Sequence, residues 1–168
     1  MTLGTRSRRS LVVSCVLACA VLAATAAPAR ADITAFIGLT TTPERHALKG
    51  FSGGVGLIIV AFEVEYADIS EDSVELLPGL KTYSGNVLLQ TPVPIMGTQF
   101  YGTAGVEGYR ETLGALHETH VGTNIGGGAK IKLVGPLRVR VDYRIFKLQG
   151  TPIHSVYQRF YVGANLKF

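Results

Sequence analysis

Cysteine is nearly missing from this sequence of 168 residues: Cys15 and Cys19 are the only two. Both lie in the first 31 residues, so residues 32–168 contain no thiol at all. This long part of the chain can therefore form neither a disulfide bond nor a zinc site built on cysteine thiolates. A domain without these cross-links depends on secondary structure and packing for its stability.

Net charge is also missing from most of the chain. The whole sequence has 16 Lys and Arg against 12 Asp and Glu, but four of the arginines precede residue 32. Residues 32–168 therefore carry equal numbers of basic and acidic side chains. The basic isoelectric point comes from the N-terminal segment and gives no reason to expect a nucleic-acid partner.

The first 31 residues have the layout of an export signal. A basic head precedes the uncharged run Leu11–Ala27, and small residues follow as far as Ala31. This layout predicts a signal peptide over residues 1–31, cleaved after Ala31. The apolar run is shorter than the roughly 20 residues of a membrane-spanning helix, which argues against an anchor. Arg8 and Arg9 resemble a twin-arginine signal, so general and twin-arginine export both remain open.

Sustained helical periodicity is absent from residues 32–168, which we expect to form one domain. Apolar and polar residues alternate instead with period two, the mark of a β-strand with two unlike faces. Each alternating segment has roughly the 9–11 residues with which a tilted strand crosses a bilayer. We expect eight strands, over residues 32–39, 51–59, 61–68, 82–90, 99–109, 121–133, 137–146 and 157–168.

The joints between these strands alternate in length. Short joints are expected near 59–61, 91–97 and 134–136. An even number of strands, with long loops at one end and short turns at the other, predicts an all-β fold: an eight-stranded antiparallel up-and-down transmembrane β-barrel. The long polar joints, which would form the external loops, are residues 40–50, 69–79, 110–120 and 147–156.

Aromatic residues give a second indication of a membrane. Tyr66, Tyr83 and Tyr143 fall near the long-loop ends of their strands, on the apolar face. Phe62 and Phe100 fall near the short-turn ends, also on the apolar face. Two such girdles are typical of a barrel that spans a bilayer.

The two faces of the strands differ in charge as well. In the stretch "LRVRVDYRIF", residues 137–146, apolar side chains alternate with three arginines and an aspartate. In a membrane barrel the apolar face contacts lipid and the charged face lines the lumen. We expect that arrangement here, with glycines making room for long side chains that reach across the lumen.

Basic residues on neighbouring strands predict where the acids must lie. A tight turn near residue 135 places Lys132 opposite Arg138 and Lys130 opposite Arg140, and like charges directly opposite are destabilising. The strand that contains Glu63 and Glu65 lies across the barrel, so we expect these two carboxylates to neutralise that cluster. The complete expected lumen charge network is Glu63, Glu65, Glu107, Lys130, Lys132, Arg138, Arg140, Asp142, Arg144 and Arg159.

The C-terminal "YVGANLKF" resembles the insertion signal of the eight-stranded outer-membrane barrels typified by the transmembrane domain of outer membrane protein A. The matching residues are Gly163, Leu166 and Phe168, whereas Tyr161 stands where that signal usually has a polar residue. The resemblance implies export through the periplasm, recognition by the barrel assembly machinery, and a place among the lipids of a Gram-negative outer membrane.

No catalytic, metal or cofactor site is expected. The expected loops contain all four histidines, His46, His117, His120 and His154. The stretch "HETH" lacks the further ligands that a metal site needs. His154 and Ser155 are adjacent, so on a strand their side chains would diverge rather than form a nucleophile–base pair.

Eight strands leave an interior filled by side chains, so porin-like conduction is not expected either. We therefore expect a structural or surface-interaction role, with a possible extracellular partner at the four loops. Two alternatives are a lipid A-modifying enzyme and a soluble, secreted lipocalin-like barrel that binds an apolar ligand.

Overall fold

The structure, a computed structural model, describes residues 30–42, 45–69, 79–113, 116–149 and 155–168. Residues 1–29, most of the expected signal peptide, lie outside this part of the chain. Within the described residues, no helix is long and apolar enough to cross a membrane. The eight strands are β1 (Arg30–Thr42), β2 (Ala47–Gly56), β3 (Val60–Ile69), β4 (Gly79–Gln90), β5 (Thr98–Leu113), β6 (Leu116–Val134), β7 (Leu137–Leu148) and β8 (Val156–Lys167).

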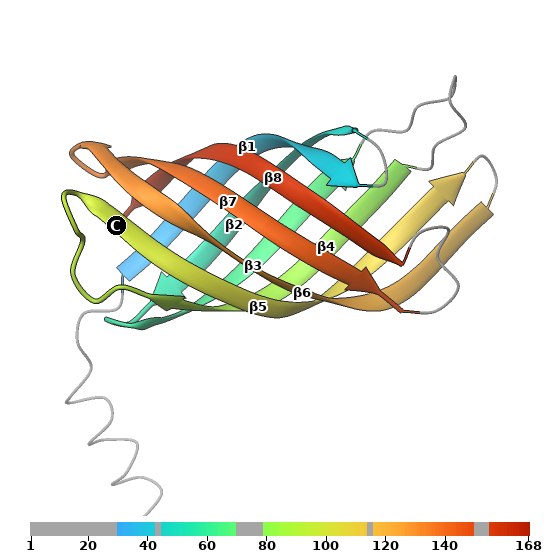
Figure 1. Cartoon of the computed structure of the whole chain (residues 1–168), viewed down its shortest axis with the longest axis horizontal. Coiled ribbons are helices and arrows are strands. Elements are labelled where there is room, and N and C mark those ends of the chain that lie inside the picture. Colours follow the sequence, from blue (N-terminus) through green and yellow to red (C-terminus); the bar gives the residue numbers. More distant parts are fainter. Residues whose placement is uncertain (1–29, 43–44, 70–78, 114–115, 150–154) are drawn as a thin grey trace, which may run out of the picture.

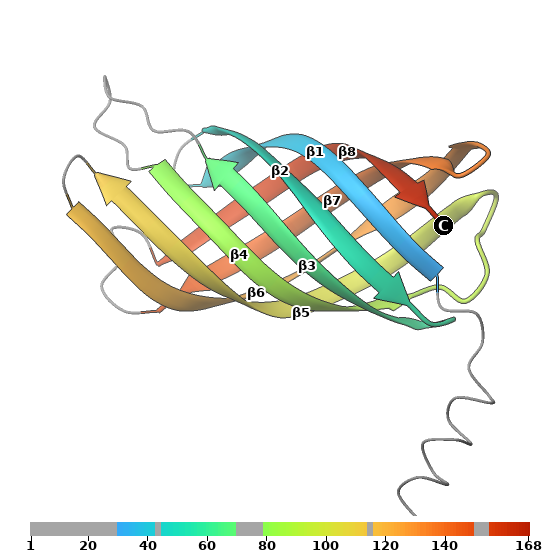
Figure 2. The same ribbon diagram turned by 180° about the vertical axis from the view of Figure 1, so that it is seen from behind.

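These strands close into one barrel in chain order, each antiparallel to its neighbours, with β8 beside β1. The start of β1, the C-terminus and three short turns share one end of the barrel, the turn end (Figure 1). The opposite end, the loop end, contains the ends of β1, β3, β5 and β7 and the starts of β2, β4, β6 and β8, as the view from behind also shows (Figure 2). The predicted eight-stranded up-and-down barrel is confirmed.

Turn geometry sets the register at the turn end. Gly135 has a φ of 54°, a left-handed conformation that suits glycine, and Pro136 follows it. The hairpin pairs Lys130 with Arg140 and Lys132 with Arg138, as predicted. On the neighbouring pair of strands, Gly54 of β2 lies opposite Glu63 of β3, and Ser52 of β2 lies opposite Glu65.

One strand boundary was predicted wrongly at the turn end. Residues 57–59 were expected to continue a strand, but β2 stops at Gly56 and these residues form a turn, in which Leu57 N donates a 2.8 Å hydrogen bond to Val60 O. The three apolar side chains are more than half exposed. Apolar side chains that project from the barrel at a bilayer surface resemble a strand in sequence, which explains the error.

The expected loops were too long, because strands continue into them. Leu113 of β5 still pairs with Leu116 of β6, so most of residues 110–120 forms a hairpin rather than a polar loop. β2 likewise begins at Ala47, within the expected loop 40–50. Residues 43–44, 70–78, 114–115 and 150–154 lie outside the described residues.

Wherever the strand side chains are described, they alternate between the lumen and the exterior. On β7 the inward series from the turn end to the loop end is Arg138, Arg140, Asp142, Arg144, Phe146 and Leu148, all buried except the half-buried Arg138. The exterior is apolar over the middle of the barrel, where Ile37 and Val64 are at least 70% exposed. The arginines therefore point inward, as predicted from the alternating stretch.

Candidate functional site

The centre of the lumen contains a charge cluster of three arginines and three carboxylates. Its members are Arg140 and Arg144 on β7, Arg159 on β8, Glu63 and Glu65 on β3, and Asp142 on β7. The opposite charges are equal in number, and all six residues are at most 4% exposed. A buried charge is stable only with such partners, because desolvation otherwise disfavours it strongly.

Arg140 joins β7 to β3 across the barrel. Its guanidinium forms a two-bond contact with Glu63, from Nη1 to Oε2 and from Nη2 to Oε1, the latter at 3.2 Å. Its Nε donates to the Tyr101 hydroxyl at 2.7 Å, and that hydroxyl donates to Asp142 Oδ2 at 2.6 Å. Planar two-bond contacts of this kind are the strongest and most directional that an arginine makes.

Arg144 connects the remaining acids of the cluster. Its Nε donates to Asp142 Oδ1 at 2.8 Å, and its Nη2 lies 3.0 Å from Glu63 Oε1 and 3.3 Å from Glu65 Oε2. Glycine on β6 makes room for this side chain, because a Cβ at Gly126 would lie 2.7 Å from Arg144 Cγ. The prediction that glycines accommodate long lumen side chains holds at this position.

Arg159 of β8 is the last member of the cluster. It lies where the lumen changes from charged to aromatic side chains. Its Nη2 pairs with Glu65 Oε1. Its guanidinium carbon also lies 4.6 Å from the centre of the Phe146 ring and 5.4 Å from that of Tyr161, in cation–π geometry. Glu65 is therefore paired with Arg144 and Arg159, not with the basic cluster of residues 130–140 that was expected.

The basic residues nearest the turn end have different partners from those predicted. Lys130 is buried and pairs with Asp32 of β1, an acid that the sequence analysis did not place in the lumen. Arg138 is half-buried and donates to Gln99 Oε1 at 3.1 Å. Lys132 is exposed, so its inclusion in the lumen network was wrong. It lies at the end of β6, beside the register shift before the turn, where the lumen opens to solvent.

Glu107 is buried in the lumen but is not tied to a base by any ion pair among the described residues. Its Oε2 accepts a 3.4 Å hydrogen bond from the Tyr157 hydroxyl, and its Oε1 has no partner there. Glu107 therefore lies in the lumen, as expected, but within the described part of the chain its contact is a hydrogen bond from Tyr157 rather than an ion pair. A carboxylate at this position would be a poorly compensated buried charge.

At the loop end of the barrel, the distribution of apolar and charged side chains is the reverse of that in the middle. Inward side chains become apolar there, and several pack in one cluster with the stacked rings of Phe146 and Tyr157, whose centres are 4.5 Å apart. We call this part the inverted section. Its inward residues include Leu48, Ile69, Leu80, Phe146 and Leu148, and the outward residues between and beside them are Lys49, Asp68, Lys81 and Lys147.

An aromatic row lies on the exterior just below the inverted section, on its turn-end side. Phe51, Tyr66 and Tyr83 pair across β2, β3 and β4, with ring centres 5.5 and 5.0 Å apart. Tyr143 pairs with Phe160 farther round the barrel. The expected aromatic girdle therefore stands where the outer surface changes from apolar to charged, as at a membrane boundary.

The histidines do not form a site in the described part of the chain. His46 precedes β2, whereas His117 and His120 belong to β6 rather than to a loop, which corrects their expected placement. His154 lies outside the described residues, and Ser155 is exposed just before β8. Among the described residues, no group of three or more histidines and carboxylates could hold a metal ion.

The expected insertion-signal residues lie on β8 and just after it. Gly163 faces the lumen, where a Cβ would meet Phe36 and Thr34 of β1. Leu166 faces outward and is 43% exposed. Phe168 follows the strand, is exposed, and donates its backbone N–H to Ala31 O at 2.8 Å.

Known structures match this architecture although sequences do not. No protein-family model matches the chain, and no curated protein matches its sequence. The N-terminal β-barrel domain of OprF from Pseudomonas aeruginosa superimposes with a TM-score of 0.67 over 83% of this chain and 97% of that one, at 17% identity. The chain has the fold of an eight-stranded outer-membrane barrel.

Two further outer-membrane-type barrels support the same assignment. Neisserial surface protein A matches with a TM-score of 0.62 at 12% identity, over 84% of this barrel and 96% of that chain. The attachment invasion locus protein Ail of Yersinia pestis, solved with the heparin analogue sucrose octasulfate, matches with a TM-score of 0.56 at 14% identity, over 83% and 99%. At such identities the likeness concerns the fold of the barrel and not its activity.

Proposed function

We propose that this barrel is a non-conducting outer-membrane protein with a structural or surface-interaction role, exposing its loop end to the outside of the cell. The observation that carries the proposal is the combination of a filled lumen with an inverted section. Charged residues fill the middle of the lumen and apolar residues fill its loop end. Such an interior holds the barrel rigid and leaves no place for a column of water.

The soluble lipocalin-like alternative is inconsistent with the side-chain distribution. A soluble barrel that binds an apolar ligand keeps apolar residues inside and charged residues outside along its whole length. Here that arrangement is confined to the inverted section, whereas Arg140 and Arg144 are completely buried in the middle. An apolar exterior around a charged interior favours a bilayer as the surroundings.

The surface role rests on how far the barrel extends beyond its aromatic row. The hairpin of β5 and β6 continues to Leu113 and Leu116, well past Tyr83 and its partner Gly108. A hairpin whose strands stay paired this far can present residues to an external partner with a smaller loss of entropy on binding than an unpaired loop.

Conductance and location test the proposal together. Purified barrel in a planar bilayer should give no discrete channel openings, and the protein in cells should fractionate with the outer membrane and migrate differently in gels before and after heating. Stable, stepwise conductance would overturn the non-conducting role. Recovery in the soluble periplasmic fraction would overturn the membrane location.

Assembly gives a further test through the last residue. We expect Phe168→Asp to lower the amount of folded barrel in the outer membrane, because it replaces the terminal aromatic of the proposed insertion signal by a charge. Leu57→Asp is a control at the same end of the barrel, outside the signal. Wild-type levels of heat-modifiable Phe168→Asp protein would contradict recognition at this residue.

A further inference from the structure

A row of charged side chains crosses four strands on the exterior of the inverted section. Lys49 of β2 pairs with Asp68 of β3, Asp68 pairs with Lys81 of β4, and Lys81 pairs with Arg110 of β5. The three basic residues are exposed, and Asp68 is half-buried. We call these four residues the cation row, because three positive charges face one negative charge.

The cation row carries more positive charge than its one carboxylate, Asp68, can neutralise. Among the described residues, no ion pair joins Lys49, Lys81 or Arg110 to a carboxylate. Neighbouring strands lie about 4.8 Å apart, so the row extends over about 14 Å from first to last strand. Adjacent like charges such as Lys81 and Arg110 destabilise a sheet unless an anion lies between them. An anion from outside the chain would supply that compensation.

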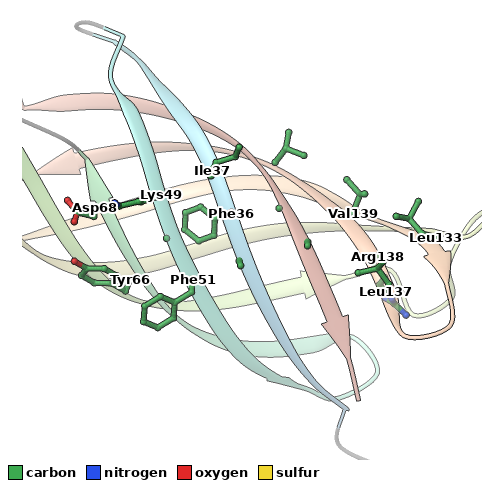
Figure 3. A pocket seen from close by; sticks show the side chains of 15 residues that line it. Phe36, Ile37, Lys49, Phe51, Tyr66, Asp68, Leu133, Leu137, Arg138 and Val139 are labelled. Carbon is green, nitrogen blue, oxygen red and sulfur yellow. The ribbon is translucent and has the colours of Figure 1, made fainter.

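Two apolar grooves lie on the turn-end side of the cation row, and the first is lined in part by Lys49 and Asp68 of the row. One, of about 710 Å³, starts between the Lys49–Asp68 and Phe51–Tyr66 pairs and continues over the small residues Ala35 and Ala164 of β1 and β8 (Figure 3). A second, of about 680 Å³, lies beside Phe51, Tyr66 and Tyr83, and its lining includes Gly53 and Gly85. A Cβ at either glycine would have no atom within 4 Å, so this second groove has room that a side chain could fill.

We propose that the cation row and these two grooves bind one amphiphilic ligand, a bisphosphorylated glycolipid of the lipid A type. The phosphates lie on Lys49, Lys81 and Arg110, and acyl chains lie in the grooves on either side of Phe51 and Tyr66. Basic side chains beside a membrane surface attract anionic head groups in this way. The inference rests on the proposed function, because it places the loop end in the outer leaflet.

The width of the row favours two phosphates over one. A single phosphodiester head can contact two adjacent cations, but it cannot also reach a third that is two or three strands away. A disaccharide with a phosphate at each end matches a row of about 14 Å. Two grooves that share Phe51 and Tyr66 in their linings likewise match a ligand with several acyl chains.

Retention of added lipid by the purified chain tests the site. Wild-type barrel and the double variant Lys49→Gln, Lys81→Gln are mixed in mild detergent with diphosphoryl lipid A, and bound lipid is counted by native mass spectrometry. We expect the double variant to retain about 10- to 30-fold less, the effect of removing two cations beside an anionic head. Lys147→Gln, an outward lysine whose cross-strand partners are Thr123 and Val156, is the matched control and should retain lipid normally.

The outcomes separate this inference from the proposed function. Unchanged retention by the double variant, or equal retention of dephosphorylated lipid A, would overturn the site even if the protein fractionates with the outer membrane. Equal retention of phosphatidylglycerol would overturn the assignment to a bisphosphorylated head. A dimer that excludes lipid from the wild type would show that a second copy covers the grooves. Heat-modifiable mobility of all variants establishes that they are folded.

Discussion

The barrel has two sections that are built from the same strands with opposite arrangements. In the middle, Arg140, Arg144 and Glu63 are inside while valines and isoleucines face outward. In the inverted section, leucines and Phe146 are inside while lysines face outward. The difference shows where the environment of the barrel changes from lipid to water. Each section exposes the side chains that are favourable in its own environment, apolar ones in lipid and charged ones in water.

The two interiors also specify the fold differently. The charge cluster is directional: each guanidinium has fixed partners at fixed distances, so a wrong register or a wrong strand order would leave charges unpaired. The apolar packing of the inverted section is non-directional and depends on area and volume. We therefore expect the charge cluster to set specificity and the apolar section to close the lumen, and the following changes test that division.

The largest effect is expected for Glu63→Gln in the charge cluster. It removes the carboxylate that binds both Arg140 and Arg144, and an uncompensated buried charge costs about 3–5 kcal/mol of unfolding free energy. Reversible urea unfolding in lipid vesicles measures the loss. Asp68→Asn, on the exterior of the same strand, is the control and should have a small effect.

A double change then tests whether Glu63 acts through its partner. Removing Arg140 as well should recover part of the loss, with a coupling of about 0.5–3 kcal/mol. Strictly additive effects would mean that the contact across the barrel does not contribute to stability, which would remove the distinction between the two interiors.

The next effect is expected in the inverted section. Leu148→Ala deletes a buried side chain from the apolar cluster and should cost about 2–5 kcal/mol, because it removes apolar burial and leaves a cavity. This loss should be the same at low and high salt. Leu148→Met, which conserves volume, should cost much less. A strong salt dependence for Leu148→Ala would show that the section is not stabilised by apolar packing.

The same substitution, valine to arginine, can be made on the exterior of both sections. Val141→Arg places a charge outward in the middle of β7 and should cost about 2–4 kcal/mol in a bilayer, whereas Val156→Arg, outward at the loop end of β8, should cost about 0–1 kcal/mol. The same unfolding measurement gives both values. Equal losses for the two variants would place the membrane boundary elsewhere.

The sequence predicted the middle of the barrel better than its loop end, for a physical reason. The period-two pattern was interpreted with its apolar residues facing outward. This interpretation is correct for the middle of the barrel, where the exterior is apolar. At the loop end the pattern is reversed, with apolar residues facing inward, and the expected strands stopped short of it. The inward residues that they missed are Leu48, Ile69, Leu80 and Leu148. A pair such as Leu80–Lys81, just before Thr82 and Tyr83, is the signal from which the inversion could have been found.

Individual partners in the lumen were harder to predict than the cluster itself. The hairpin register placed Lys130 beside Arg140 correctly, since a short turn fixes it. Which acid reaches which base depends on the stagger of eight tilted strands, and a small change in that stagger exchanges the partners. Glu65 therefore forms an ion pair with Arg159 rather than with the basic residues near the turn end, and Lys130 forms one with Asp32.

The smallest effect is expected for Glu107→Gln, although Glu107 is buried about as deeply as Glu63. Glu63 has two arginine partners, whereas Glu107 has only a 3.4 Å hydrogen bond from Tyr157 and a second oxygen without a partner among the described residues. An amide oxygen can accept the same bond without a buried charge, so the variant should differ from wild type by about 0–1 kcal/mol. Urea unfolding of Glu107→Gln beside Glu63→Gln compares two identical substitutions in one lumen. A loss for Glu107→Gln as large as that for Glu63→Gln would mean that burial alone, and not ion pairing, determines the contribution of a lumen carboxylate, and the contrast between the two sections would lose its basis.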